Sequence, residues 1–180
     1  MLSLPDLLDH EMQFLSVGLN PSIPSVIAGF YFANPRNRFW RALNACGVFE
    51  QTLEPSLSSS QYLLQHYHIG FTDLVKRPTA GCKDLVAADY RAGSHRLQTL
   101  IEQLQPRVVW FHGKLSCQKY LQYSPQKSLH CRWGLQHWHI NGCPVYVSPN
   151  PSSANAAYSL SDISDSYREL LQTSDTHSLC

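Results

Sequence analysis

Short apolar runs alternate along the chain with segments in which apolar residues recur at helical spacing. Four runs have strand character, and polar or turn-forming residues follow each of them: Phe14 to Leu19, Ile69 to Val75, Val108 to Phe111 and Val145 to Val147. Runs that are apolar on both faces are typical of strands inside a parallel sheet. The pattern therefore predicts four strands at these positions.

The segments between the runs predict helices. Asn34 is expected to cap one helix, with Pro35 at its first position and Gly47 just past its end. Apolar spacing predicts the others over 89–104, in a short segment after Gly113, and over 161–172. Strands that alternate with helices indicate a three-layer α/β/α fold with a central, mostly parallel four-stranded sheet.

Two similar tripeptides follow directly after predicted strands. Asn20-Pro21-Ser22 comes after the first strand and Asn150-Pro151-Ser152 after the last. Ligands of open α/β sheets bind beyond the carboxyl ends of the strands. If both strands are parallel, these loops meet at one edge of the sheet, where a binding site is expected.

The length of the chain indicates its number of domains, and its charge distribution bears on nucleic-acid binding. With 180 residues, the chain is expected to form one domain over 1–173 and a flexible polar tail over 174–180. The net charge is only +1, but residues 34–132 hold 13 of the 14 Lys and Arg residues against six acidic residues. A basic middle between acidic ends allows nucleic-acid binding and predicts modest nonspecific affinity.

Cysteine and histidine spacing argues against bound metal. The six cysteines include no Cys-x-x-Cys pair and are expected to be reduced. Two His-x-His pairs, at 66–68 and 137–139, have no nearby carboxylate or cysteine at ligand spacing, so neither metal nor cofactor is expected. The sequence has no apolar run of membrane-spanning length, and its N-terminus lacks the basic region of a signal peptide. A cytoplasmic location away from membranes is expected.

Five segments occur in the same order as in a known enzyme family. They are Gly18 to Pro21, Gly29 to Trp40, Gly70 to Thr79, Gln105 to Lys114, and Pro149 to Ser153. Together they resemble the mismatch-specific uracil and thymine DNA glycosylases of the uracil-DNA glycosylase superfamily. The likeness extends from about Phe14 to Leu171.

The resemblance implies hydrolysis of the N-glycosidic bond of uracil mispaired with guanine, after the base has been flipped out of the duplex. Thymine and ethenocytosine are further candidate bases. By this resemblance Asn20 orients the attacking water, Phe32 stacks on the flipped base, and Gly18, Leu19 and Ser22 line the pocket. Backbone N–H groups near Ser22 and Phe32 would stabilise the leaving base.

Two residues differ from the family or allow two interpretations. Asp73 stands where the best-known members have Lys or Asn, so it is a tentative second catalytic group that reads the base or activates water. The alternative is a strand-end aspartate that caps a helix. Lys114 matches a family Gly-Lys and is interpreted as a phosphate contact or as a lysine that starts a helix.

The loop from Asn150 matches the family segment that enters the minor groove. The substrate-binding residues expected there are Asn150, Ser152, Ser153, Ala154 and Asn155. Ala154 is a poor wedge, Ala156 cannot bind a phosphate, and Tyr158 is a candidate plug. Mismatched double-stranded DNA, or single-stranded DNA, is therefore the expected partner of a monomeric protein.

Three other functions are compatible with the sequence. A related glycosylase could act mainly on a deaminated purine or an alkylated base, and a panel of lesions separates the two. The altered groove loop also fits a catalytically weak protein that binds lesions. A generic nucleotide-binding α/β module agrees less well with the five ordered segments.

Overall fold

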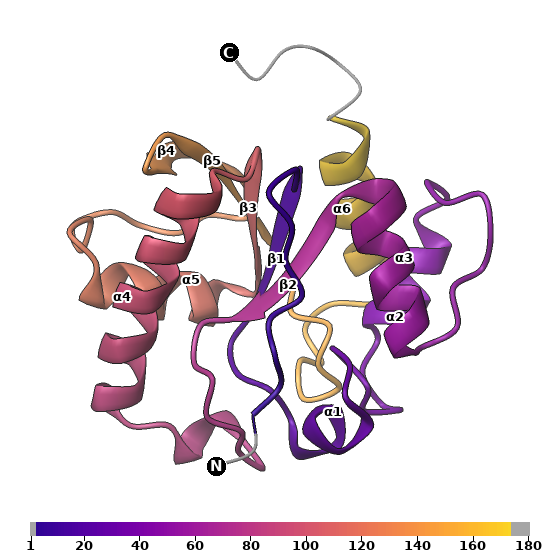
Figure 1. Cartoon of the computed structure of the whole chain (residues 1–180), viewed down its shortest axis with the longest axis horizontal. Coiled ribbons are helices and arrows are strands. Elements are labelled where there is room, and N and C mark those ends of the chain that lie inside the picture. The colour runs from indigo at the N-terminus through magenta and orange to yellow at the C-terminus, as the bar shows by residue number, and fades with distance from the viewer. Residues whose placement is uncertain (1–2, 174–180) are drawn as a thin grey trace.

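A single sheet organises the computed structural model, which describes residues 3–173. Its strands lie in the order β2-β1-β3-β5-β4, and only β4 runs antiparallel to its neighbour (Figure 1). The strand bounds are β1 Phe14–Gly18, β2 Ile69–Asp73, β3 Val108–His112, β4 Gly134–Ile140 and β5 Cys143–Ser148. The predicted α/β/α fold is confirmed.

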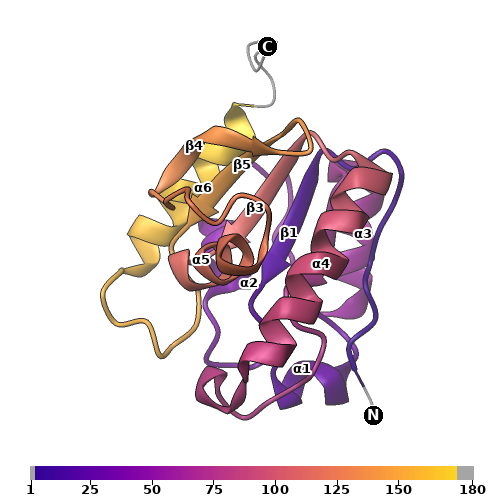
Figure 2. The same cartoon turned by 90° about the vertical axis from the view of Figure 1, so that its left-hand side faces the viewer.

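Helices cover both faces of the sheet, because the inner strands are apolar on both sides. In β3, Val108 and Trp110 pack in one core while Val109 and Phe111 pack in the other. One face carries α4 (Ala87–Leu104) and α5 (Lys114–Tyr123), which lie in front of the sheet in Figure 2. The opposite face carries α2 (Phe39–Ala45), α3 (Leu57–Tyr67) and α6 (Leu160–Gln172). Within 3–173, no helix has the length and apolar character needed to cross a membrane.

The prediction of four strands is wrong by one, because β4 was missed. Its side chains alternate, with Gln136, Trp138 and Ile140 buried and the residues between them exposed. Such alternation is typical of an edge strand with one face in water, and it lacks the continuous apolar run of a central strand. The pair His137 and His139 is simply the outward face of this strand.

The helix expected to start at Asn34 instead starts at Phe39. Asn34 Oδ1 accepts from the N–H of Arg36 at 3.0 Å, and Asn37 Oδ1 accepts from the N–H of Phe39 at 2.8 Å. Asparagine side chains that bind the backbone two residues on favour turns over helix. The helices predicted near 89–104, after Gly113 and near 161–172 are confirmed, whereas the expected tail at 174–180 lies outside the described residues.

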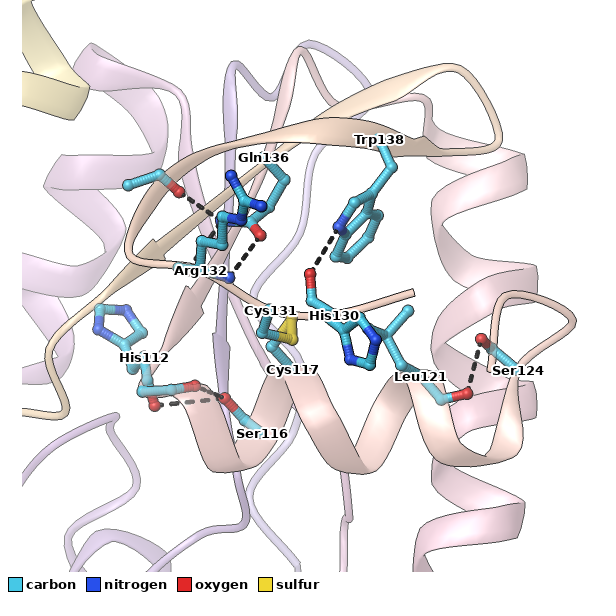
Figure 3. The surroundings of a disulfide bond; sticks show 12 residues. His112, Ser116, Cys117, Leu121, Ser124, His130, Cys131, Arg132, Gln136 and Trp138 are labelled. Carbon is cyan, nitrogen blue, oxygen red and sulfur yellow. Dashed lines mark hydrogen bonds between the residues drawn. A yellow bond between two sulfur atoms is a disulfide. The ribbon is translucent and has the colours of Figure 1, made fainter. Parts of the chain in front are cut away.

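A disulfide corrects the expectation that all cysteines are reduced. Cys117 in α5 is bonded to Cys131, which precedes β4 (Figure 3). The 14-residue separation has no recognisable motif, and the pairing arises because the chain folds back from α5 towards the sheet edge. Cys46, Cys82 and Cys143 are free.

Reduction of this disulfide should destabilise the fold. Closing a loop of this length restricts the unfolded chain and contributes about 3 kcal/mol to the free energy of unfolding. Urea unfolding with and without dithiothreitol, repeated on Cys131→Ser, measures the loss. Cys82→Ser is the matched control, because Cys82 is exposed and unpaired. Equal urea midpoints for the parent and Cys131→Ser would contradict the prediction.

Candidate functional site

A cavity of about 690 Å³ lies at the carboxyl ends of the parallel strands. Figure 1 shows α1 (Ile23–Ala28) and the loop from β5 to α6 at this same end of the sheet. Every site residue predicted from the sequence, except the exposed Ser153, lines the cavity: Gly18, Leu19, Asn20, Ser22, Phe32, Asp73, Lys114, Asn150, Ser152, Ala154 and Asn155. The two Asn-Pro-Ser loops therefore meet as expected.

The side-chain amide of Asn20 is held in one orientation. Its Nδ2 donates to Thr79 Oγ1 at 2.8 Å and to the carbonyl oxygen of Arg77 at 3.1 Å. The Thr79 hydroxyl itself donates to the carbonyl oxygen of Gly81 at 2.9 Å, so it presents a lone pair to Asn20. Among the described residues no donor contacts Asn20 Oδ1. This oxygen is thus a fixed acceptor for a small molecule such as water.

Phe32 provides an aromatic wall in a strained backbone conformation. Its φ of 58° lies in the left-handed region, which bulky residues rarely adopt. Its ring stacks on Phe39, with centroids 4.1 Å apart, and meets the edge of His112 at 5.0 Å. The surrounding contacts thus fix a planar apolar group at the cavity wall.

His112, at the end of β3, is a neutral part of the same wall. It is buried, with Nε2 2.8 Å from Ser16 Oγ and Nδ1 3.3 Å from the Tyr167 hydroxyl. Burial lowers the pKa of His112 to about 3, so the ring is uncharged near neutral pH. Its hydrogen bonds to Ser16 and Tyr167 fix the ring that packs against Phe32.

Asp73 is a buried carboxyl group at the end of β2, directly beside Gly18 at the end of β1. A Cβ at position 18 would lie only 2.3 Å from Asp73 Oδ1, so a larger residue there would have to displace the carboxyl group. Asp73 Oδ2 is buried and has no hydrogen-bond partner among the described residues. Burial raises the pKa of Asp73 to about 7, with Lys76 and Arg96 opposing this rise and Asp6 adding to it. Asp73 thus lines the cavity with one carboxyl oxygen that has no partner among the described residues.

A second carboxylate behind Asp73 is fully paired. Asp6 accepts from Lys76 Nζ at 2.6 Å, from Arg96 at 2.9 Å and from the Thr72 hydroxyl at 2.7 Å. Burial raises the pKa of Asp6, but its hydrogen bond and charge interaction with Lys76 and the charge of Arg96 outweigh that effect and lower it. The two cations are thus committed to Asp6, and the carboxyl group of Asp73 has no direct ion pair.

Arg38 fixes the loop from Asn150 to Tyr158 through hydrogen bonds to its backbone. Its guanidinium donates to the carbonyl oxygens of Tyr158 at 2.5 Å, Asn155 at 2.6 Å and Ser152 at 3.1 Å. Asn155 Nδ2 also donates to the carbonyl oxygen of Asn150 at 2.9 Å. The loop is thereby preorganised against the cavity, although Ala154 offers no bulk at its tip.

Lys114 is the first residue of α5 and also lines the cavity. The turn before it needs glycine, because Gly113 has a φ of 95° and a Cβ there would lie 2.9 Å from Asn150 Cβ. Lys114 Nζ lies 4.6 Å from the ring centroid of Trp133. The interpretation of Lys114 as a lysine that starts a helix is confirmed, whereas its contact with a phosphate stays a prediction.

Comparison with known protein families identifies the family of the chain. The family model described as the uracil DNA glycosylase superfamily matches residues 5–173. The chain belongs to this superfamily. Membership makes it a DNA glycosylase, a hydrolase of N-glycosyl bonds that acts on DNA.

The superfamily fold also appears in a solved structure. A protein of Methanosarcina acetivorans, provisionally named a uracil DNA glycosylase, matches with a TM-score of 0.60 and 23% identity, over 93% of this chain and 96% of that one. At this identity the likeness supports the fold alone. Within residues 3–173 of this glycosylase, no cluster of three or more His, Cys, Asp or Glu side chains is suited to hold a metal ion.

Several residues that shape the glycosylase site were missed by sequence reasoning. Thr79 and Arg38 lie inside quoted family segments, but only their contacts reveal that they orient Asn20 and hold the groove loop. His112 lies inside the quoted segment Gln105 to Lys114, and no pattern in the sequence assigns it a role. Asp6 comes from an N-terminal segment that pairs with β2 through Leu7 and Phe71, and no local pattern marks it.

Proposed function

We propose that this superfamily member is a monofunctional mismatch-specific glycosylase that removes uracil paired with guanine and so initiates base excision repair. The observation that carries the proposal is the half-buried Asn20 amide, whose nitrogen is bound by Thr79 and Arg77 while its oxygen remains an acceptor in the cavity. Thymine and ethenocytosine opposite guanine are proposed as further substrates. The protein is expected to act as a cytoplasmic monomer.

In the proposed mechanism, the flipped base stacks on Phe32 and the bond between C1′ of the sugar and the base nitrogen breaks. The electron pair of that bond leaves with the base, and backbone N–H groups near Ser22 and Phe32 donate to its carbonyl oxygens. Asn20 Oδ1 accepts a hydrogen bond from the water that attacks C1′. An amide is a poor base, so bond cleavage must be well advanced before water adds, and good leaving groups such as uracil are favoured. The proton that the added water loses ends on the departing base anion, so the products are the protonated free base and an abasic site.

Asp73 is proposed as the group that reads the edge of the base. Its buried, unpartnered Oδ2 supports this role better than the helix-capping alternative, because no backbone N–H in the described chain binds the carboxyl group. As a carboxylate it would accept from an N3–H or an exocyclic amine, and when protonated it would donate instead. This versatility favours a wider range of bases than uracil alone, including deaminated purines or alkylated bases as the second candidate function.

The groove loop is expected to make well-paired DNA a poor substrate. Ala154 cannot fill the space that a flipped base leaves, and opening a stable pair costs a few kcal/mol. We therefore expect faster release of uracil opposite guanine than opposite adenine, with single-stranded uracil also accepted.

Excision from matched oligonucleotides tests these proposals. Substrates carry uracil, thymine, ethenocytosine or hypoxanthine opposite guanine, uracil opposite adenine, or single-stranded uracil, and alkaline cleavage reports abasic sites. Equal rates on uracil opposite guanine and opposite adenine would contradict the mismatch preference. Release of another lesion ahead of uracil would identify the second candidate function. No excision of any base at saturating enzyme would leave a lesion-binding protein.

A further inference from the structure

Trp133 stands apart from the other tryptophans of the chain. Its side chain is 40% exposed, whereas Trp40, Trp110 and Trp138 are at most 6% exposed. It lies just before β4 and lines the mouth of the cavity. Its exposure at the cavity leaves a large aromatic face within reach of a bound molecule.

The backbone around Trp133 is held firmly although its ring is in water. The buried Gln136 side chain accepts from the N–H of Arg132 at 2.9 Å and donates to the carbonyl oxygens of Arg132 at 2.9 Å and Gly134 at 2.8 Å (Figure 3). It thereby binds both neighbours of Trp133. Two residues upstream, the disulfide of Cys131 ties the same segment to α5. Preorganisation of this kind lowers the entropy cost of binding a partner.

A second aromatic ring and a cation accompany Trp133. Tyr158, from the groove loop, meets it edge to face with centroids 5.1 Å apart, and Lys114 Nζ lies 4.6 Å from the Trp133 centroid. All three side chains line the cavity. We call Trp133 and Tyr158 the aromatic ledge. The Arg38 guanidinium holds the carbonyl oxygen of Tyr158, so both rings of the ledge stand on fixed backbone.

The sequence around the ledge carries positive charge only. From residue 103 to residue 161 there is no Asp or Glu, whereas Arg107, Lys114, Lys119, Lys127 and Arg132 occur in that span. Lys114 lies beside the Trp133 ring, and Arg132 directly precedes Trp133 in the sequence. Aromatic faces combined with cations suit a polyanion that offers unstacked bases.

We propose that the aromatic ledge stacks on an unstacked nucleobase of bound DNA next to the flipped base. This proposal rests on the proposed glycosylase function. It assigns to the ledge the filling of space in the base stack, for which the Ala154 side chain is too small. Trp133 occupies space in the disturbed base stack, Tyr158 supports its edge, and Lys114 and Arg132 neutralise nearby phosphates. Stacking on an aromatic side chain tolerates any base, so the ledge supports binding to many sequence contexts.

Tryptophan fluorescence tests the contact without requiring catalysis. The probe is a duplex with a tetrahydrofuran abasic analogue opposite guanine, which contains no base that the enzyme can remove. Acrylamide should quench mainly Trp133 in the free protein, since the other three rings are buried. The duplex should quench the same component and protect it from acrylamide. DNA binding with no change in that component would overturn the proposal.

Substitutions give the second measurement. Trp133→Ala should weaken binding of the abasic duplex about tenfold, while Trp133→Phe stays within about threefold of the parent. Leu135→Ala is the matched control, because Leu135 is 50% exposed on β4, two residues after Trp133, but does not line the cavity. Equal affinities for Trp133→Ala and Leu135→Ala would overturn the ledge. If Trp133→Ala unfolds, the parent's fluorescence decides alone. Failure of the proposed function is distinguishable, since it appears as no excision while the abasic duplex still quenches Trp133.

Discussion

Asn20→Ala is expected to bind a duplex containing uracil opposite guanine as tightly as the parent while losing most of its excision activity. The variant removes the acceptor that positions water and leaves the cavity walls in place. Loss of the group that positions a reacting molecule can lower the rate by about 100-fold or more. Single-turnover excision at saturating enzyme, alongside DNA binding by fluorescence anisotropy, measures the two effects separately. Full activity in Asn20→Ala would refute the assignment of Asn20.

Thr79→Val serves as the companion variant for Asn20. It keeps the volume of the side chain but removes the oxygen that accepts from Asn20 Nδ2. The amide should then rotate more freely, because only backbone carbonyl oxygens remain to hold it. We expect about a tenfold loss in single-turnover rate with unchanged DNA affinity, smaller than for Asn20→Ala, because the water is then positioned less precisely.

The sheet edge that carries the site could be predicted from sequence for a local reason. A strand that is buried on both faces must be apolar throughout, and the polar residues that follow it mark its carboxyl end. Asn20 and Asn150 each follow such a strand, so parallel topology alone brings them together. β4 was not predicted, because an edge strand exposes every second side chain and so lacks a continuous apolar run.

The contacts that orient the site could not be predicted in this way. Arg38 reaches the backbone of residues more than a hundred positions away, and Asp6 contacts Lys76 and Arg96 across three separate elements. The pairing of Cys117 with Cys131 depends on the path of the chain between α5 and β4. These contacts follow from tertiary structure, and neither periodicity nor spacing records them.

Asp73→Asn is expected to change how stability depends on pH. In the folded protein, burial raises the pKa of Asp73 to about 7, whereas the unfolded chain has a carboxyl group of ordinary pKa near 3.8. Between these values the folded state holds a proton that the unfolded state has lost. The free energy of unfolding of the parent must therefore fall as pH rises through this window. The amide introduced by Asp73→Asn carries no such proton, so the variant lacks this fall.

The expected size follows from the same difference in pKa. A separation of about three units corresponds to about 4 kcal/mol between about pH 4 and about pH 8. His112 acts in the opposite direction, because burial lowers its pKa from the ordinary 6.5 to about 3. The free energy of unfolding therefore decreases as the pH falls below 6.5 towards 3. That contribution is common to parent and variant and cancels when they are compared. Urea unfolding of both proteins across the pH range measures the difference, and parallel curves would show that Asp73 keeps an ordinary pKa.

The same variant decides what Asp73 does for catalysis. If Asp73 accepts from the base, the parent's excision of uracil should rise as the carboxyl group ionises near pH 7, where its pKa lies. Asparagine retains an acceptor oxygen but does not titrate, so Asp73→Asn should give a flat profile in this range and a different order of preferred lesions. Identical pH profiles and identical lesion preferences for the two proteins would remove Asp73 from the site, even if the stability curves diverge. In that case the buried, unpartnered carboxyl group would destabilise the folded state and have no role in base recognition.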